Sequence, residues 1–163
     1  MGSGCRYKCL KCGYSFMSAN GVGFLFPVVY EETIQKAKAG ELGEVIKTFF
    51  DEHPNGAINA ENVTLCCDKC GKLSLGQDLT MYLPNDENYK DIEHGRWTVG
   101  MPFEGANYVT NWDLEEHYKE YAKYQHKCTE CGGNMHIVSD EEQLMCPKCK
   151  TPFEPSTEII MWD

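Results

Sequence analysis

The clearest hydrophobic pattern in the chain lies between residues 42 and 52. Apolar residues there occupy positions i, i+3, i+4, i+7 and i+8, and so form one helical stripe: Leu42, Val45, Ile46, Phe49 and Phe50. Pro54 and Gly56 end this helix by removing a backbone donor and turning the chain. A shorter helix is predicted for residues 30–39, stopped by Gly40. Together they predict a helical hairpin at about residues 28–55.

Alternation of apolar and polar residues, with a period of two, predicts strands elsewhere in the chain. Residues 79–83 alternate apolar and polar side chains, so strands are expected at 62–66 and 72–83. Another strand is expected to close the chain at 158–162, and a short one at 97–101. The polar residues 84–96 are the best candidate for a linker. A third helix is predicted at 112–125, because acidic residues fill its first turn and lysines lie towards its end.

The cysteines add the strongest chemical signal. Eight of the ten form four pairs with two residues between the partners, a spacing that makes a tight turn and points both sulfurs at one place: Cys9 and Cys12, Cys67 and Cys70, Cys128 and Cys131, Cys146 and Cys149. The residue after each second cysteine often needs a left-handed backbone, which glycine tolerates best. Gly13, Gly71 and Gly132 occupy that place in three turns, whereas Lys150 in the fourth predicts a more strained turn.

Two such turns make one four-thiolate site, the closed tetrahedral geometry of structural zinc. The gap of 14 residues between Cys131 and Cys146 suits a hairpin, so we assign one site to Cys128, Cys131, Cys146 and Cys149. By elimination, the second site is Cys9, Cys12, Cys67 and Cys70, whose gap of 54 residues holds the helical hairpin. A cross-braced pairing of the first turn with the third and the second with the fourth stays open. Free thiols or disulfides are the remaining alternative.

These motifs resemble the zinc-ribbon and rubredoxin-like group. Residues 126–163 resemble a complete zinc ribbon, and the segment Tyr7–Phe16 resembles the first metal-binding turn of a rubredoxin. The second turn departs from rubredoxin, because Cys67-Asp68-Lys69-Cys70 follows a helical insertion. The resemblance covers about half of the chain. It implies antiparallel hairpins and two Zn²⁺ ions per chain, with iron as a less favoured occupant, and it implies no particular activity.

The sequence therefore predicts an α+β fold with two zinc ribbons. The first ribbon spans residues 1–84 and is interrupted by the helical hairpin, whose apolar face we expect to pack on the ribbon. Residues 85–102 form a linker. Residues 103–163 contain a helix followed by the second ribbon.

Charge narrows the possible partners. There are 15 basic and 25 acidic residues, which gives a formal net charge of −10. Each four-thiolate zinc site adds about −2, because four thiolates outweigh one divalent ion. An acidic chain is poorly suited to phosphate backbones or anionic membranes. No apolar run is long enough for a transmembrane helix. Ten cysteines without an export signal favour a cytoplasmic protein.

The remaining residues suggest no catalytic group. None of the five histidines has the spacing of a metal ligand, and Cys5 and Cys66 are expected to be free thiols. Three functional classes stay open. The first is an intracellular protein-interaction or regulatory module held together by zinc, the second a nucleic-acid-associated zinc ribbon, and the third a rubredoxin-like iron protein that transfers electrons. The negative net charge favours the protein-interaction module over the nucleic-acid-associated zinc ribbon.

Overall fold

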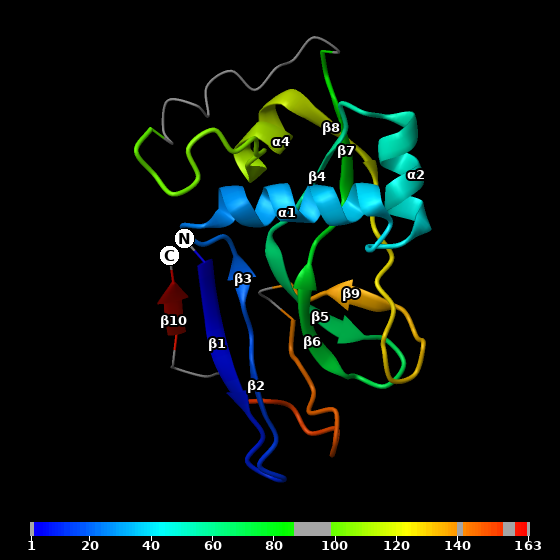
Figure 1. Cartoon of the computed structure of the whole chain (residues 1–163). Helices are drawn as coiled ribbons and strands as arrows, with labels where there is room; N and C mark the ends of the chain where they lie inside the picture. Colours follow the sequence, from blue (N-terminus) through cyan, green and yellow to red (C-terminus); the bar gives the residue numbers. More distant parts are fainter. Residues whose placement is uncertain (1, 87–98, 140–141, 155–158, 163) are drawn as a thin grey trace. The chain divides into compact units, whose positions relative to one another are not determined.

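The computed structural model describes residues 2–86, 99–139, 142–154 and 159–162. The chain folds into two compact units that alternate along the sequence. Unit 1 contains residues 1–23, 61–78 and 125–163, and unit 2 contains residues 24–60 and 79–124. Unit 2 is thus supplied by two insertions into the chain of unit 1. Element labels follow Figure 1.

Unit 1 is built on an antiparallel sheet. Its main strand order is β10 (Ile159–Trp162), β1 (Gly2–Lys8), β3 (Asn20–Gly21), β5 (Asn62–Cys67) and β6 (Leu73–Gln77). Two further strands pair with members of this row: β2 (Ser15–Met17) with β1, and β9 (Met135–Ile137) with β5. The strand β5 therefore joins sequence-distant parts of the chain.

Unit 2 combines helices with a small sheet. Its helices are α1 (Phe26–Ala39), α2 (Glu44–Glu52) and α4 (Asn111–His117), and its sheet has the order β4 (Ala57–Ile58), β7 (Met81–Pro84) and β8 (Tyr118–Ala122). The α+β class predicted from the sequence is confirmed. Among the residues that the structure describes, no helix is long and apolar enough to cross a membrane.

Both helices of the predicted hairpin are present. Helix α1 begins at Phe26, earlier than predicted, with Pro27 in its first turn where a missing N–H costs nothing. It ends at Ala39, and the φ of 82° at Gly40 lets the backbone turn back and cap the last carbonyls. Helix α2 buries Ile46, Phe49 and Phe50 of the predicted stripe, whereas Val45 is exposed and Leu42 precedes the helix.

The stripe was expected to pack on the first ribbon, and among the described residues only the part of that ribbon around Ile58, Leu79 and Met81 belongs to the core it enters. The buried face of α2 packs with Ala37, Ile58, Leu79 and Met81, which are all residues of unit 2. The helices thus cover a hydrophobic core of their own unit, formed with β4 and β7. This core could not be predicted from the sequence, because its strand residues Ile58 and Met81 lie on two short segments that are not adjacent in the chain.

Two predicted elements were wrong in part. The helix expected at 112–125 starts with a capping box between Thr110 and Asp113 but ends at His117. Tyr118 is extended and begins β8, because pairing with β7 overrides the local helical preference. The strand expected at 72–83 is broken at Leu79, whose φ is 63°, so that β6 and β7 lie in different sheets.

The predicted domain division, with a first ribbon at 1–84, a linker at 85–102 and a second ribbon at 103–163, stays a prediction. Residues 87–98 of the linker lie outside the described part of the chain. The same holds for residues 97–98 of the expected strand at 97–101, and residues 99–101 form turns. The closing strand is present as β10, which pairs antiparallel with β1. Glu158, its expected first residue, lies outside the described residues.

Candidate metal centre

Two groups of four cysteines lie in unit 1. The first contains Cys9, Cys12, Cys146 and Cys149, and the second contains Cys67, Cys70, Cys128 and Cys131. Within each group all four sulfurs lie within 4.8 Å of one another. The structure thus gathers every cysteine of the four paired turns, and each group could hold one metal ion.

The sulfur spacing fits a metal ion better than a disulfide. The nearest sulfurs in the first group lie 3.4 Å apart for Cys9 and Cys149, and 3.5 Å for Cys12 and Cys146. In the second group they lie 3.5 Å apart for Cys67 and Cys131, and 3.7 Å for Cys70 and Cys128. A disulfide needs about 2.05 Å. Four sulfurs at about 2.3 Å from a tetrahedral ion lie about 3.8 Å apart, so the donor set fits a four-thiolate ion.

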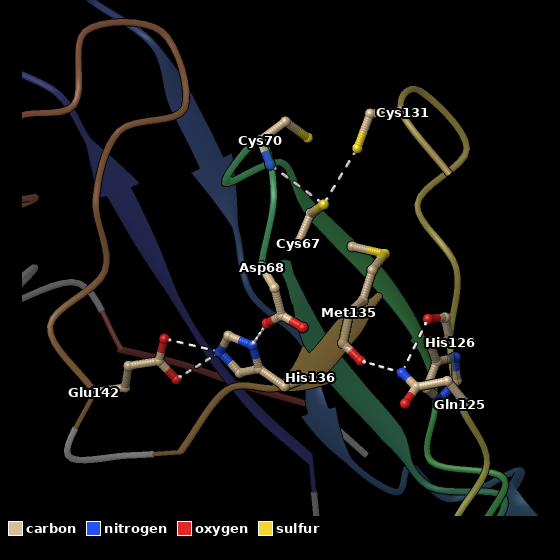
Figure 2. A network of polar contacts seen from close by, with 9 residues as sticks. All are labelled: Cys67, Asp68, Cys70, Gln125, His126, Cys131, Met135, His136 and Glu142. Carbon is tan, nitrogen blue, oxygen red and sulfur yellow. Dashed lines mark hydrogen bonds and ion pairs between the residues drawn. The ribbon is translucent and has the colours of Figure 1, made fainter. Parts of the chain in front are cut away.

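The pairing of turns differs from the sequence-based assignment. The first turn joins the fourth and the second joins the third, so the two sites are nested along the chain. Neither the neighbouring pairs assigned from the sequence nor the cross-braced alternative was right. The reason is strand pairing: β9 lies beside β5 and places Met135 opposite Cys67. This brings the turn of Cys128 and Cys131 to the turn of Cys67 and Cys70. Figure 2 shows the sulfur of Cys131 facing that of Cys67.

The four turns have one common construction. In each, the residue after the second cysteine donates its N–H to the carbonyl oxygen of the first cysteine, over 2.9 Å in all four cases. That residue has a positive φ: 72° at Gly13, 75° at Gly71, 66° at Gly132 and 58° at Lys150. The expected left-handed backbone is confirmed in all four turns, including the strained lysine.

Lys150 also connects the two sites. Its Nζ donates to the carbonyl oxygen of Cys70 over 2.6 Å, although the two residues belong to different groups of cysteines. Lys72 makes a second link by pairing with Glu130 over 2.9 Å, between the two turns of one site. These cations lie beside groups that become anionic when the thiols ionise.

Hydrogen bonds prepare some of the thiols for ionisation. The hydroxyl of Thr151 is the main cause that lowers the pKa of Cys9 to about 6, and the backbone N–H of Cys70 is the main cause that lowers the pKa of Cys67 to about 6. The backbone N–H groups of Tyr14 and Lys72 also act on Cys12 and Cys70. There, burial and the neighbouring thiols outweigh them and raise each pKa to about 12. Each site therefore holds at least one thiol with a lowered pKa and one with a raised pKa. A bound metal would displace protons from the thiols of the site.

The two remaining cysteines lie in strands of unit 1. Cys5 is in β1, where Ser18 accepts from its backbone N–H and donates to its sulfur. Cys66 is in β5 and lies near His136 and Glu142, with all three ligand atoms within 4.8 Å. Sequence reasoning missed this second kind of cluster, because its members share no motif spacing. The only available signal was strand alternation, which turns Cys66 away from Cys67.

Comparisons with family models, with curated proteins and with solved structures each found nothing that matches this chain.

Proposed function

We propose that this chain is a structural zinc protein that serves as an intracellular protein-interaction or regulatory module, with two Zn²⁺ ions bound by the eight paired cysteines. The observation that carries the proposal is the nested pairing. Each four-thiolate group joins turns more than 50 residues apart in sequence, which lie on different strands and loops of one unit. A closed set of four thiolates leaves no position for a substrate, as expected of a metal that stabilises a fold.

The edge of the sheet supports a protein partner. Strand β10 lies at the end of the strand order of unit 1. Ile159 and Met161 point to the same side, as residues two apart in a strand do, and are 72% and 64% exposed. A strand edge with apolar side chains can add an extended segment of another protein. The net charge of −10 favours a partner of this kind over nucleic acid.

The proposal is tested first by the metal content per chain. It is measured by elemental mass spectrometry on protein purified from cells supplied with both zinc and iron. We expect two zinc ions and negligible iron. One or two iron ions would contradict the structural role and support electron transfer. The exposed Cys12 is the one observation that favours this second function, because a solvent-facing thiolate can pass an electron to a partner.

The interaction role needs its own experiment. A double variant, Ile159→Lys with Met161→Lys, should lose the partners that the wild-type chain captures and still bind two zinc ions. Val45→Lys is a matched control, since Val45 is an exposed apolar residue of unit 2. Unchanged capture by the double variant would overturn the role of β10. Retardation of nucleic acid at micromolar protein in low salt would favour the nucleic-acid function instead.

A further inference from the structure

A cluster of mixed ligands lies on unit 1, outside the two four-thiolate groups. Cys66 on β5 and His136 on β9 are directly opposite one another in the antiparallel register. Residues opposite in this way project from the same face of a sheet. Glu142 lies beside them, and its N–H donates to the carbonyl oxygen of Ser139. All three side chains are partly exposed, so an ion could enter from solvent.

The ring of His136 lies between two carboxylates (Figure 2). Its Nδ1 is 2.5 Å from Asp68, and its Nε2 is 3.0 and 3.2 Å from the two oxygens of Glu142. A neutral imidazole has one N–H, and an ionised carboxylate only accepts. If the proton is on Nδ1, the lone pair of Nε2 faces the lone pairs of Glu142. A positive charge between these two groups removes the conflict, either as a second proton or as a metal ion.

The distances suit a metal ion at this position. An ion about 2.1 Å from Nε2 and from a carboxylate oxygen separates those atoms by about 3.0 to 3.4 Å, and the observed separations fall in this range. Asp68 on the opposite nitrogen repeats a frequent arrangement, in which a carboxylate fixes the tautomer of a metal-binding histidine. The sulfur of Cys66 lies within 4.8 Å of the ligand atoms of His136 and Glu142 and could be a third ligand. A thiolate and a carboxylate together balance the charge of a divalent ion.

We propose that Cys66, His136 and Glu142 form a third metal site, for a divalent transition ion such as Zn²⁺, positioned by Asp68. The site has three protein ligands and one open position, which is the arrangement of exchangeable or reactive zinc and differs from the closed four-thiolate groups. Because its ligands are exposed and of mixed type, it binds more weakly than those groups. It does not depend on the interaction role proposed above.

Cobalt titration of the full chain tests this site. The chain is first loaded with two equivalents of Zn²⁺, which thiolate groups hold more tightly than Co²⁺. Co²⁺ is then added as the probe, and its visible ligand-field bands and thiolate-to-cobalt charge-transfer band are recorded. We expect one further equivalent of bound Co²⁺ with a charge-transfer band. Absence of a third equivalent in the wild-type chain would overturn the proposal.

Variants assign the bound cobalt to its ligands. Cys66→Ser should remove the charge-transfer band, and His136→Asn and Glu142→Gln should each abolish saturable binding. Asp68→Asn should weaken binding about 10- to 100-fold, as loss of such a supporting carboxylate does. Cys5→Ser and His117→Asn are controls that remove a thiol and an imidazole elsewhere. Binding that persists unchanged in Cys66→Ser and His136→Asn would place the ion elsewhere and refute the site. Retention of two zinc ions in each variant separates this result from loss of the fold.

Discussion

The two units bury different kinds of side chain. Unit 2 has an aliphatic and aromatic core: Ala37, Ile46, Phe49, Phe50, Ile58, Leu79 and Met81. Two core clusters among the described residues of unit 1 are each smaller, and four of their nine buried residues are cysteines of the candidate metal sites: Cys9, Cys67, Cys128 and Cys146. Four cysteines that must ionise to bind a metal add little apolar burial to cores of this size, and small cores often need a metal to be stable. From this difference we expect unit 1 to depend on a bound metal for its stability and unit 2 to depend on packing.

The largest expected effect follows from removing one thiol of unit 1. Cys146 is fully buried. It belongs to the group of four cysteines that brings the turn at residues 146–149 together with the turn at residues 9–12. Cys146→Ser should lose one zinc ion and the native structure of unit 1, because structural zinc contributes on the order of 10 kcal/mol of apparent folding free energy. Amide NMR spectra of the full chain, with zinc content measured in parallel, would show which residues lose their native signals.

Cys5→Ser is the matched control, since Cys5 belongs to neither group of cysteines. It should keep two zinc ions and a wild-type spectrum. If Cys146→Ser kept both zinc ions and all signals of unit 1, the dependence of this unit on metal would be wrong.

The second effect concerns unit 2. Ile46 is fully buried in the core of that unit. Ile46→Ala should destabilise unit 2 by about 2 to 5 kcal/mol, through lost burial and the cavity left behind. Urea unfolding followed by the NMR signals of unit 2 measures the change, and zinc content should stay at two per chain. A loss of zinc from the folded variant would show that the two units are not stabilised separately.

Alanine substitutions at two neighbouring glycines distinguish the effect of backbone strain from the effect of crowding at a metal site. Gly132 has a φ of 66° and open space where a Cβ would lie, so Gly132→Ala should cost about 1 to 2 kcal/mol through strain alone. At Gly133 a Cβ would meet the sulfurs of Cys67 and Cys131 at 3.2 and 3.3 Å. Gly133→Ala should therefore weaken metal binding at that site, whereas Gly132→Ala should leave it nearly unchanged. Competition with a zinc chelator measures both, and equal zinc affinities would contradict the crowding.

The local structure of the turns could be predicted from the sequence. Two-residue spacing between cysteines fixes the turn, and the following residue must adopt a positive φ whatever the rest of the fold does. Lys150 shows this most clearly, because it adopts the left-handed conformation without being glycine. The stripe of Ile46, Phe49 and Phe50 was equally informative, since helical periodicity is a property of one short segment.

The pairing of the turns could not be predicted in the same way. It depends on β9 pairing with β5, a contact between residues about 70 positions apart. Sequence proximity favoured a site between Cys131 and Cys146, but these residues belong to different groups. The contacts of His136 were missed for the same reason, because strand register brings it to Asp68, 68 positions away in the sequence, and Glu142 meets its other ring nitrogen.

The smallest effect concerns the charge on His136. Its pKa is raised above the ordinary 6.5, first by the hydrogen bond to Glu142 and then by that to Asp68. A pKa raised by folding means that the protonated form stabilises the fold. This contribution is complete below the unfolded value and is lost as the pH rises through the folded value. With zinc held at two equivalents per chain, His136→Gln should destabilise unit 1 at about pH 6 and have less effect at about pH 9. The His136 side chain is 43% exposed, so solvent screens the pair and the shift in the urea midpoint should be small. A difference between the two proteins that grew with pH would show that His136 acts through its neutral form, as a metal ligand does.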